Sequence, residues 1–300
     1  MYYPILRGKQ NELLALRELV EANVLGNYTP IIEPVKNNFS SLIKAIEELN
    51  KKGIEPVVIV NPDKGDFKKS NPILSYKNIQ NEKGNLSFLP CINYQDPRAA
   101  DIIKGLSRYS IISNGASQEL VQASHTAEKT IIKADVSPVI LEEMKNVILF
   151  DDFFQSQDKN ANYPSESKFT GIHTYYKKSP NVIGFGDYTI TGSEFTESGG
   201  PAYVVAIHLS YIDDKRYHEK YIRHYLSFDD KTSKKGPDKF RHALNILINE
   251  VNSKQFNFIE SNGIAGFRDL NHKQHFPGLG QVKKLSIMHH IETFNDYLSH

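Results

Sequence analysis

Three residues that could bind an anion follow the first apolar segment of the chain. Arg7 and Lys9 flank Gly8, and the apolar periodicity of a helix starts directly after them. Arginine offers a planar fork of hydrogen-bond donors and lysine a compact positive charge, which suit phosphate and carboxylate ligands. Glycine between them allows a left-handed turn. We therefore predict that Arg7, Gly8 and Lys9, together with Lys36, form an anion-binding turn.

Acidic residues elsewhere suggest a second kind of chemistry. Four carboxylates follow short apolar segments and could hold a hard divalent cation, which prefers oxygen ligands: Glu33, Asp135, Asp151 and Asp152. Such a metal beside basic groups would suit phosphodiester hydrolysis, and it is the one cofactor that this pattern suggests. The candidate catalytic residues are then Arg7, Lys9, Glu33, Asp135, Asp151 and His208.

Histidine and cysteine add little to this picture. His208 lies in an apolar segment and could be a general base or a metal ligand, but a hydrogen-bonded core histidine is an equal alternative. His289 and His290 are neighbours and project about 100° apart on a helix, so they do not form a chelating pair. Cys91 is the only cysteine, which excludes an intrachain disulfide framework, and we expect it to be buried.

The first half of the chain alternates between strand-like and helix-like segments. The strand-like segments are short, rich in β-branched residues and almost continuously apolar: residues 2–8, 28–35, 55–60, 86–94, 109–114, 129–134 and 146–150. Strands covered by helices on both faces have this character. We predict an α/β fold, a (β/α)8 TIM-barrel-like domain, and expect residues 202–211 to supply the eighth strand.

A barrel of this kind would bring the polar residues together. Its ligand sites lie where the parallel strands end, and Asn61 and Asn93 also fall at such positions, so we add them to the ligand-binding candidates. The alternative is simpler, because polar residues also cap helices and begin loops.

We predict one domain over residues 1–300, with a long insertion before the last strand and extra C-terminal helices. Residues 1–151 hold seven β/α units, residues 152–201 an inserted loop or hairpin, and residues 202–300 the last strand and helices. The inserted region combines aromatic residues with glycines, so it could be a lid over the barrel mouth. The expected hinges of that lid are Gly171, Gly192 and Gly199–Gly200. A plain surface excursion is the alternative.

Composition limits the classes of partner. Lysine plus arginine nearly balances aspartate plus glutamate, giving a net charge of +1, so no global basic field indicates nucleic-acid binding. The chain shows no signal-peptide pattern and no apolar stretch long enough to span a membrane. With one cysteine, these features lead us to expect a cytoplasmic protein without a membrane partner.

Several segments along the whole chain resemble one family. They are residues 2–16, 30–36, 183–192, 204–211 and 266–294, together with the DDFF and NYPSE motifs of the inserted region. The chain is similar to the bacterial and phage "beta protein" family, in the branch found beside a nuclease-like protein in genomic islands. The resemblance implies an accessory role in a mobile-element or phage-defence locus, with the adjacent nuclease-like protein as the candidate partner.

Two functions follow. The first is an accessory protein that binds an anionic ligand or a partner protein at the barrel mouth. The alternative is a metal-assisted phosphodiesterase or related hydrolase. An enzyme should bring at least two carboxylates and a basic group together around a concave site, whereas a binding protein can have a filled mouth.

Overall fold

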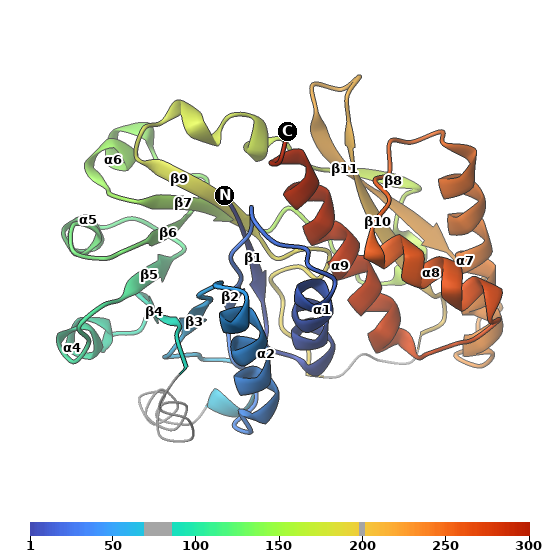
Figure 1. The fold of residues 1–300 in the computed structure, drawn as a ribbon, viewed down its shortest axis with the longest axis horizontal. Helices are drawn as coiled ribbons and strands as arrows, with labels where there is room; N and C mark the ends of the chain where they lie inside the picture. Colours follow the sequence, from blue (N-terminus) through green and yellow to red (C-terminus); the bar gives the residue numbers. More distant parts are fainter. Residues whose placement is uncertain (69–85, 198–201) are drawn as a thin grey trace.

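The computed structural model describes residues 1–68, 86–197 and 202–300. Eight parallel strands close into a barrel on one side of the molecule (Figure 1). The predicted TIM-barrel-like fold is thus confirmed. The sequence also predicts a short helix over residues 71–81, which lie outside the described residues.

The first seven strands match the predicted segments, except that β7 extends one residue past its segment, to Asp151. They are β1 (Tyr2–Leu6), β2 (Ile31–Ile32), β3 (Val57–Ile59), β4 (Leu89–Asn93), β5 (Ser110–Ser113), β6 (Thr130–Lys133) and β7 (Val147–Asp151). The helical elements between them are α1 (Gln10–Glu21), α2 (Ser40–Lys51), the short 3-10 turn η1 (Gly65–Phe67), α4 (Ala99–Lys104), α5 (Gln118–Ser124) and α6 (Pro138–Glu143). Each strand pairs in parallel with the next, so the carboxyl ends meet at one mouth.

The eighth strand is not the one that we predicted. β9 (Val182–Asp187) closes the barrel between β7 and β1, whereas residues 202–211 lie outside it. The glycines of β9 give the reason. A Cβ on Gly184 would lie 2.4 Å from Cε2 of Tyr3, and a Cβ on Gly186 would lie 2.5 Å from the backbone oxygen of Tyr3. β9 therefore approaches β1 so closely that only glycine fits at these two positions.

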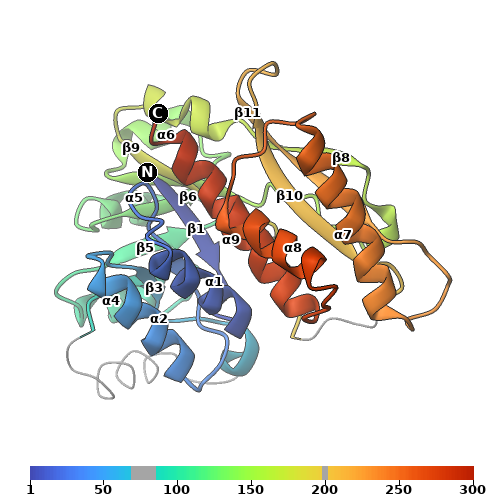
Figure 2. The ribbon, with the colours of Figure 1, turned by 45° about the vertical axis from the view of Figure 1, so that its right-hand side comes forward.

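The remaining strands form a separate antiparallel sheet. It contains β8 (Glu166–Thr170), β10 (Ala206–Asp213) and β11 (Glu219–Leu226), in the order β10-β11-β8. The helices of the C-terminal part are α7 (Gly236–Ser253), α8 (Asn262–His272) and α9 (Leu279–Tyr297). α9 runs between the barrel and the second sheet, as both ribbon views show (Figures 1 and 2).

The insertion before the last barrel strand is real but shorter than expected. It spans the chain between β7 and β9 and carries β8 and the 3-10 turns η2 (Asn160–Asn162), η3 (Ile172–Thr174) and η4 (Tyr176–Lys178). The segment assigned to the last barrel strand instead contributes β10 to the second sheet.

Side chains fill the barrel interior. The buried inner residues are Tyr3, Ile5, Ile31, Val57, Ile59, Leu89, Cys91, Ile112, Ile131, Ile148 and Phe150, and Tyr188 packs against them. Cys91 is fully buried, as expected, and burial raises the pKa of its thiol to about 12. The barrel is therefore a packed core. Among the described residues, no helix has the length and apolarity needed to cross a bilayer.

Gly184 offers a test of how β9 packs. Replacing Gly184 with alanine should destabilise the protein by about 1–3 kcal/mol, because the added methyl group overlaps the Tyr3 ring. The free energy of unfolding in urea measures this effect. Gly115→Ala is the matched control, since no atom lies within 4 Å of its Cβ position. Equal stabilities for the two variants would contradict this packing.

Candidate functional site

The turn after β1 has the conformation that the sequence predicts. Gly8 has a φ of +62°, and a Cβ there would lie 3.1 Å from the backbone oxygen of Glu33. The backbone N–H of Arg7 donates to the buried carboxylate of Glu12, and Lys9 is the N-cap residue of α1. Gly8 thus lets the chain turn sharply and directs the side chains on either side of it toward the barrel mouth.

Arg7 is buried in an ion pair. Its guanidinium donates to the carboxylate of Glu33, and the two residues are 4% and 3% exposed. Lys64 Nζ lies 3.2 Å from the other carboxylate oxygen of Glu33. The guanidinium also lies 4.7 Å from the ring centre of Tyr188, whose pKa burial raises to about 12. Arg7 therefore has internal partners and is not an open anion site in this arrangement.

The segment that follows β9 contacts the cations of the mouth. We call residues 188–197 the mouth strap. The backbone oxygen of Ser193 accepts from Arg7, and that of Thr196 accepts from Lys9 Nζ at 2.6 Å. The carboxylate of Glu197 lies 3.3 Å from Lys36 Nζ, which also pairs with Asp66 at 3.2 Å. Oxygen atoms of the mouth strap thus contact all three cations that we predicted to bind an anion.

Two further contacts hold the mouth strap in place. The Phe195 ring centre lies 4.8 Å from Lys9 Nζ, and Ser193 N donates to Asp152 at 2.7 Å. Asp152 belongs to the chain after β7, so the contacts of the mouth strap extend over the carboxyl ends of the neighbouring strands β7, β9, β1 and β2. These contacts agree with the expectation that part of residues 152–201 lies over the barrel mouth.

The second residue of the mouth strap is strained and buried. Thr189 has a φ of +54°, which is rare for a β-branched residue, and its N–H donates to Asp187 at 2.7 Å. Asp187 also accepts from the Tyr2 hydroxyl at 2.8 Å and lies 3.3 Å from His290 Nε2. Burial acts to raise the pKa of Asp187, but His290 and Lys220 outweigh it, and the pKa is lowered.

The expected hinges differ in conformation. Gly192 has a φ of +72°, so it can serve as the left-handed turn of the mouth strap. Gly171 has a φ of −113°, which other residues adopt as readily. Gly199–Gly200 lie outside the described residues.

The proposed metal ligands do not come together. Glu33 pairs with Arg7 and Lys64, and Asp152 accepts from backbone amides. Asp135 and Asp151 lie 4.0 and 3.6 Å from Lys133 Nζ. The described part of the chain contains no group of three or more His, Cys, Asp or Glu side chains placed to hold a metal ion. The prediction of a four-carboxylate metal site is therefore wrong for this arrangement, because lysines, an arginine and backbone amides take up these carboxylates.

Asn61 and Asn93 join two strand ends instead of facing a ligand. The Asn61 side chain accepts from Asn93 N at 2.7 Å and donates to its backbone oxygen at 2.9 Å. Asn61 is 2% exposed. Its amide completes the ladder between β3 and β4 where the backbone pairing stops.

His208 lies in the second sheet and not in the barrel. Its Nδ1 is 2.8 Å from Nδ1 of His224, whose Nε2 is 2.8 Å from the Ser167 hydroxyl. Burial first, and the neighbouring histidine second, lower the pKa of His208 well below its usual value. The Tyr163 ring stacks on His224 at 4.8 Å. Of the two alternatives for His208, this is the hydrogen-bonded core histidine.

Sequence reasoning missed three residues of the mouth. Lys64 completes the pairing of Glu33, Tyr188 lies under the Arg7 guanidinium, and Ser193 accepts from Arg7. The glycines of residues 184–186 were the available signal for a strand there, since glycine in a strand marks a close backbone approach. Recognising that strand would have placed Tyr188 and Ser193 at the mouth.

No protein-family model and no curated protein matches this chain. Its family resemblance therefore stays a prediction.

Proposed function

We propose that the protein binds an anionic ligand at the carboxyl end of its barrel, in the place that the mouth strap occupies. One observation supports this most directly: Arg7, Lys9 and Lys36 each contact an oxygen atom of the strap. Two of these oxygens are backbone carbonyls with only partial negative charge. A phosphate or carboxylate would offer full charge to the same donors and form stronger hydrogen bonds.

The pairing of the three cations favours a ligand that competes with the strap. Lys9 and Lys36 are the accessible groups, since the Lys36 side chain is 53% exposed. Arg7 forms an ion pair with Glu33, so its charge is already compensated. Its role is to hold the residues of the mouth in place more than to bind the ligand. A ligand would thus meet the two lysines first and displace residues 195–197.

This geometry supports binding better than metal-assisted hydrolysis. A hydrolase of that kind needs carboxylates that converge on one metal, and those of Glu33, Asp151 and Asp152 each have separate internal partners. The family resemblance adds a cellular setting, an accessory role beside a nuclease-like protein. An acidic segment of that partner would present carboxylates to the same two lysines.

Weakening the strap should strengthen anion binding. The double variant Phe195→Ala/Glu197→Gln removes the ring near Lys9 and the carboxylate near Lys36. We expect it to bind inorganic pyrophosphate about fivefold more tightly than the wild type, because a larger fraction of molecules has an open mouth. Isothermal titration calorimetry at constant ionic strength measures this.

Two further variants complete the experiment. Glu21→Gln is the matched control, since Glu21 is exposed at the C-terminal end of α1, away from the mouth, and it should leave pyrophosphate affinity unchanged. Lys9→Gln should weaken binding about tenfold while the melting temperature stays the same. Equal affinities for the wild type, the strap variant and Lys9→Gln would refute the proposal.

A further inference from the structure

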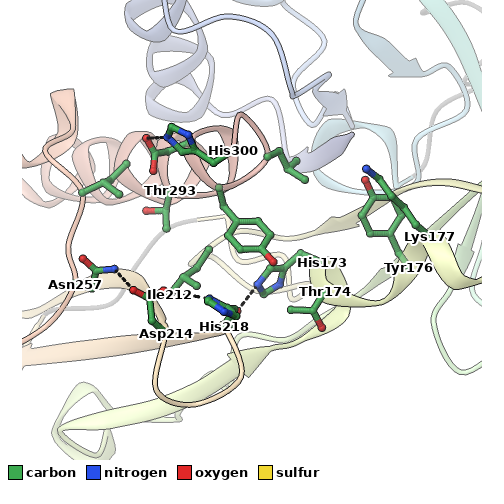
Figure 3. A pocket seen from close by; sticks show the side chains of 14 residues that line it. His173, Thr174, Tyr176, Lys177, Ile212, Asp214, His218, Asn257, Thr293 and His300 are labelled. Carbon is green, nitrogen blue, oxygen red and sulfur yellow. Dashed lines mark hydrogen bonds and ion pairs between the residues drawn. The ribbon is translucent and has the colours of Figure 1, made fainter.

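A second site lies at the opposite end of the barrel from the mouth. A cavity of about 580 Å³ opens between the 3-10 turns before β9, the β10–β11 turn and the last turns of α9 (Figure 3). One of its walls is Tyr176, whose hydroxyl accepts from the amino group of Met1 at 2.9 Å, so the barrel strands begin beside it. Its volume is within the range of small-molecule sites.

The cavity combines apolar walls with polar groups that come from separate elements. The apolar lining is formed by Tyr176, Ile212, Ile259, Tyr297 and Leu298. Figure 3 shows Asp214, His218 and Asn257 on one side, Thr293 and His300 on another, and Lys177 beside Tyr176. Pockets with mostly apolar walls and a few convergent polar groups are typical ligand sites.

His173 lines the cavity, and one of its two ring nitrogens lacks a hydrogen-bond partner. It is 4% exposed, and its Nε2 lies 2.7 Å from the backbone oxygen of His218. A carbonyl oxygen only accepts, so Nε2 must carry the hydrogen. Burial lowers the pKa of His173 to about 4, so the ring is neutral and its Nδ1 is a bare acceptor. Nδ1 is buried without a partner in the described structure, which costs free energy unless a donor reaches it.

The other acceptors of the cavity are carboxylates. Asp214 lies 3.2 Å from His218 Nδ1 and accepts from Asn257 Nδ2 at 3.0 Å. Asp296 projects from α9 and lies 3.9 Å from His300 Nε2. Lys177 is the one lysine or arginine among the lining residues. The two carboxylates of the lining select a ligand that donates hydrogen bonds and carries positive charge.

We propose that this cavity binds a small organic amine, with its ammonium group between Asp214 and Asp296 and its apolar body against Tyr176 and Tyr297. Aromatic faces stabilise a cation in addition to the carboxylates. This site is independent of the anion site at the mouth, because the two share no residue.

The experiment compares two probes that share an indole ring and differ only in the group at the end of the side chain. Tryptamine carries an ammonium group where tryptophol carries a hydroxyl. The chain contains no tryptophan, so the indole fluorescence anisotropy of either probe reports binding without protein background. We expect tryptamine to bind at least about tenfold more tightly than tryptophol. A tenfold difference in affinity is what one moderately strong ionic contact would contribute.

Variants of the exposed charged residues of the lining test where the ammonium group binds. The side chains of Asp214 and Asp296 are 63% and 49% exposed, so Asp214→Asn/Asp296→Asn should fold normally and lose the preference for tryptamine. Lys177→Gln should raise tryptamine affinity, because it removes a like charge. Asp238→Asn, on α7, is the matched control and should change nothing. Equal binding of the two probes, unchanged binding by the double variant, or no tryptamine binding up to about 10 mM would overturn the proposal.

Discussion

Lowering the pH from 7 to 4.5 is expected to destabilise the folded protein strongly, because four buried histidines are neutral in it. Burial is the largest cause in each case, and it lowers the pKa values of His173, His224 and His290 to about 4 and that of His289 to about 3. For His289 and His290 the nearby Lys220 adds to the effect. An unfolded chain would protonate all four near pH 6.5.

The sign of the effect follows from proton counting. Between pH 6.5 and about 4 the unfolded chain binds more protons than the folded one, so stability is complete above pH 6.5 and falls with acidification. Each histidine contributes up to about 1.4 kcal/mol per pH unit in this window. Glu12 and Glu292 act in the opposite direction, since burial raises their pKa values, and they offset part of the loss.

Urea unfolding followed by circular dichroism at several pH values measures this dependence. His173→Asn should reduce the slope of stability against pH by up to about 1.4 kcal/mol per unit, the contribution of one histidine. His242→Asn, on the outer part of α7, is the control and should leave the slope unchanged, since His242 is exposed. A stability that is constant between pH 7 and 4.5 would mean that these rings are not buried in neutral form.

Arg7→Ala is expected to destabilise the protein by about 3–5 kcal/mol, because it leaves the buried carboxylate of Glu33 without its main partner. Lys64 remains 3.2 Å away and keeps the loss toward the lower end of this range. The double variant Arg7→Ala/Glu33→Gln should recover much of the lost stability, since no uncompensated charge is then buried.

Chemical denaturation is measured for the wild type, Arg7→Ala, Glu33→Gln and the double variant. Together these four free energies of unfolding give the coupling free energy between Arg7 and Glu33. The control is Arg241→Ala, because Arg241 is exposed and lies 3.8 Å from Asp238 in a surface pair. Arg241→Ala should cost less than about 1 kcal/mol. If Arg7→Ala were as mild as this control, Arg7 would be an open ligand-binding residue, as its sequence position alone suggests.

The sequence predicted the scaffold well where each strand carries its own signal. The first seven strands are β-branched and apolar, and the left-handed turn at Gly8 follows from its place between a strand and a helix. β9 lacked that signal, because its inward positions are glycines that make room for Tyr3. Residues 202–211 do carry this strand signal. The strand that they contribute to is β10, however, and it pairs with β11 in the second sheet and not with a barrel strand.

For the candidate site, the sequence predicted which positively charged residues lie at the mouth. It did not predict which groups contact them. Arg7, Lys9 and Lys36 lie at the mouth as expected, but the mouth-strap groups that contact them come from residues 193–197, more than 150 positions away. Local patterns carry no information on contacts of that range. The same limit explains His208, whose partner His224 belongs to the next strand of a sheet that local patterns did not reveal.

The order of the strands along the chain ties the two sheets together. β8 belongs to the second sheet, yet it precedes β9, the strand that closes the barrel. A fragment that ends before β10 would contain β8 without the β11 strand that it pairs with, and a fragment that starts at β10 would lack an edge strand. All eight barrel strands lie before β10, so they can pair with one another in the first fragment while β8 has no partner. Dividing the chain before β10 would therefore leave the backbone groups of β8 unpaired, as an exposed edge that favours pairing with another strand.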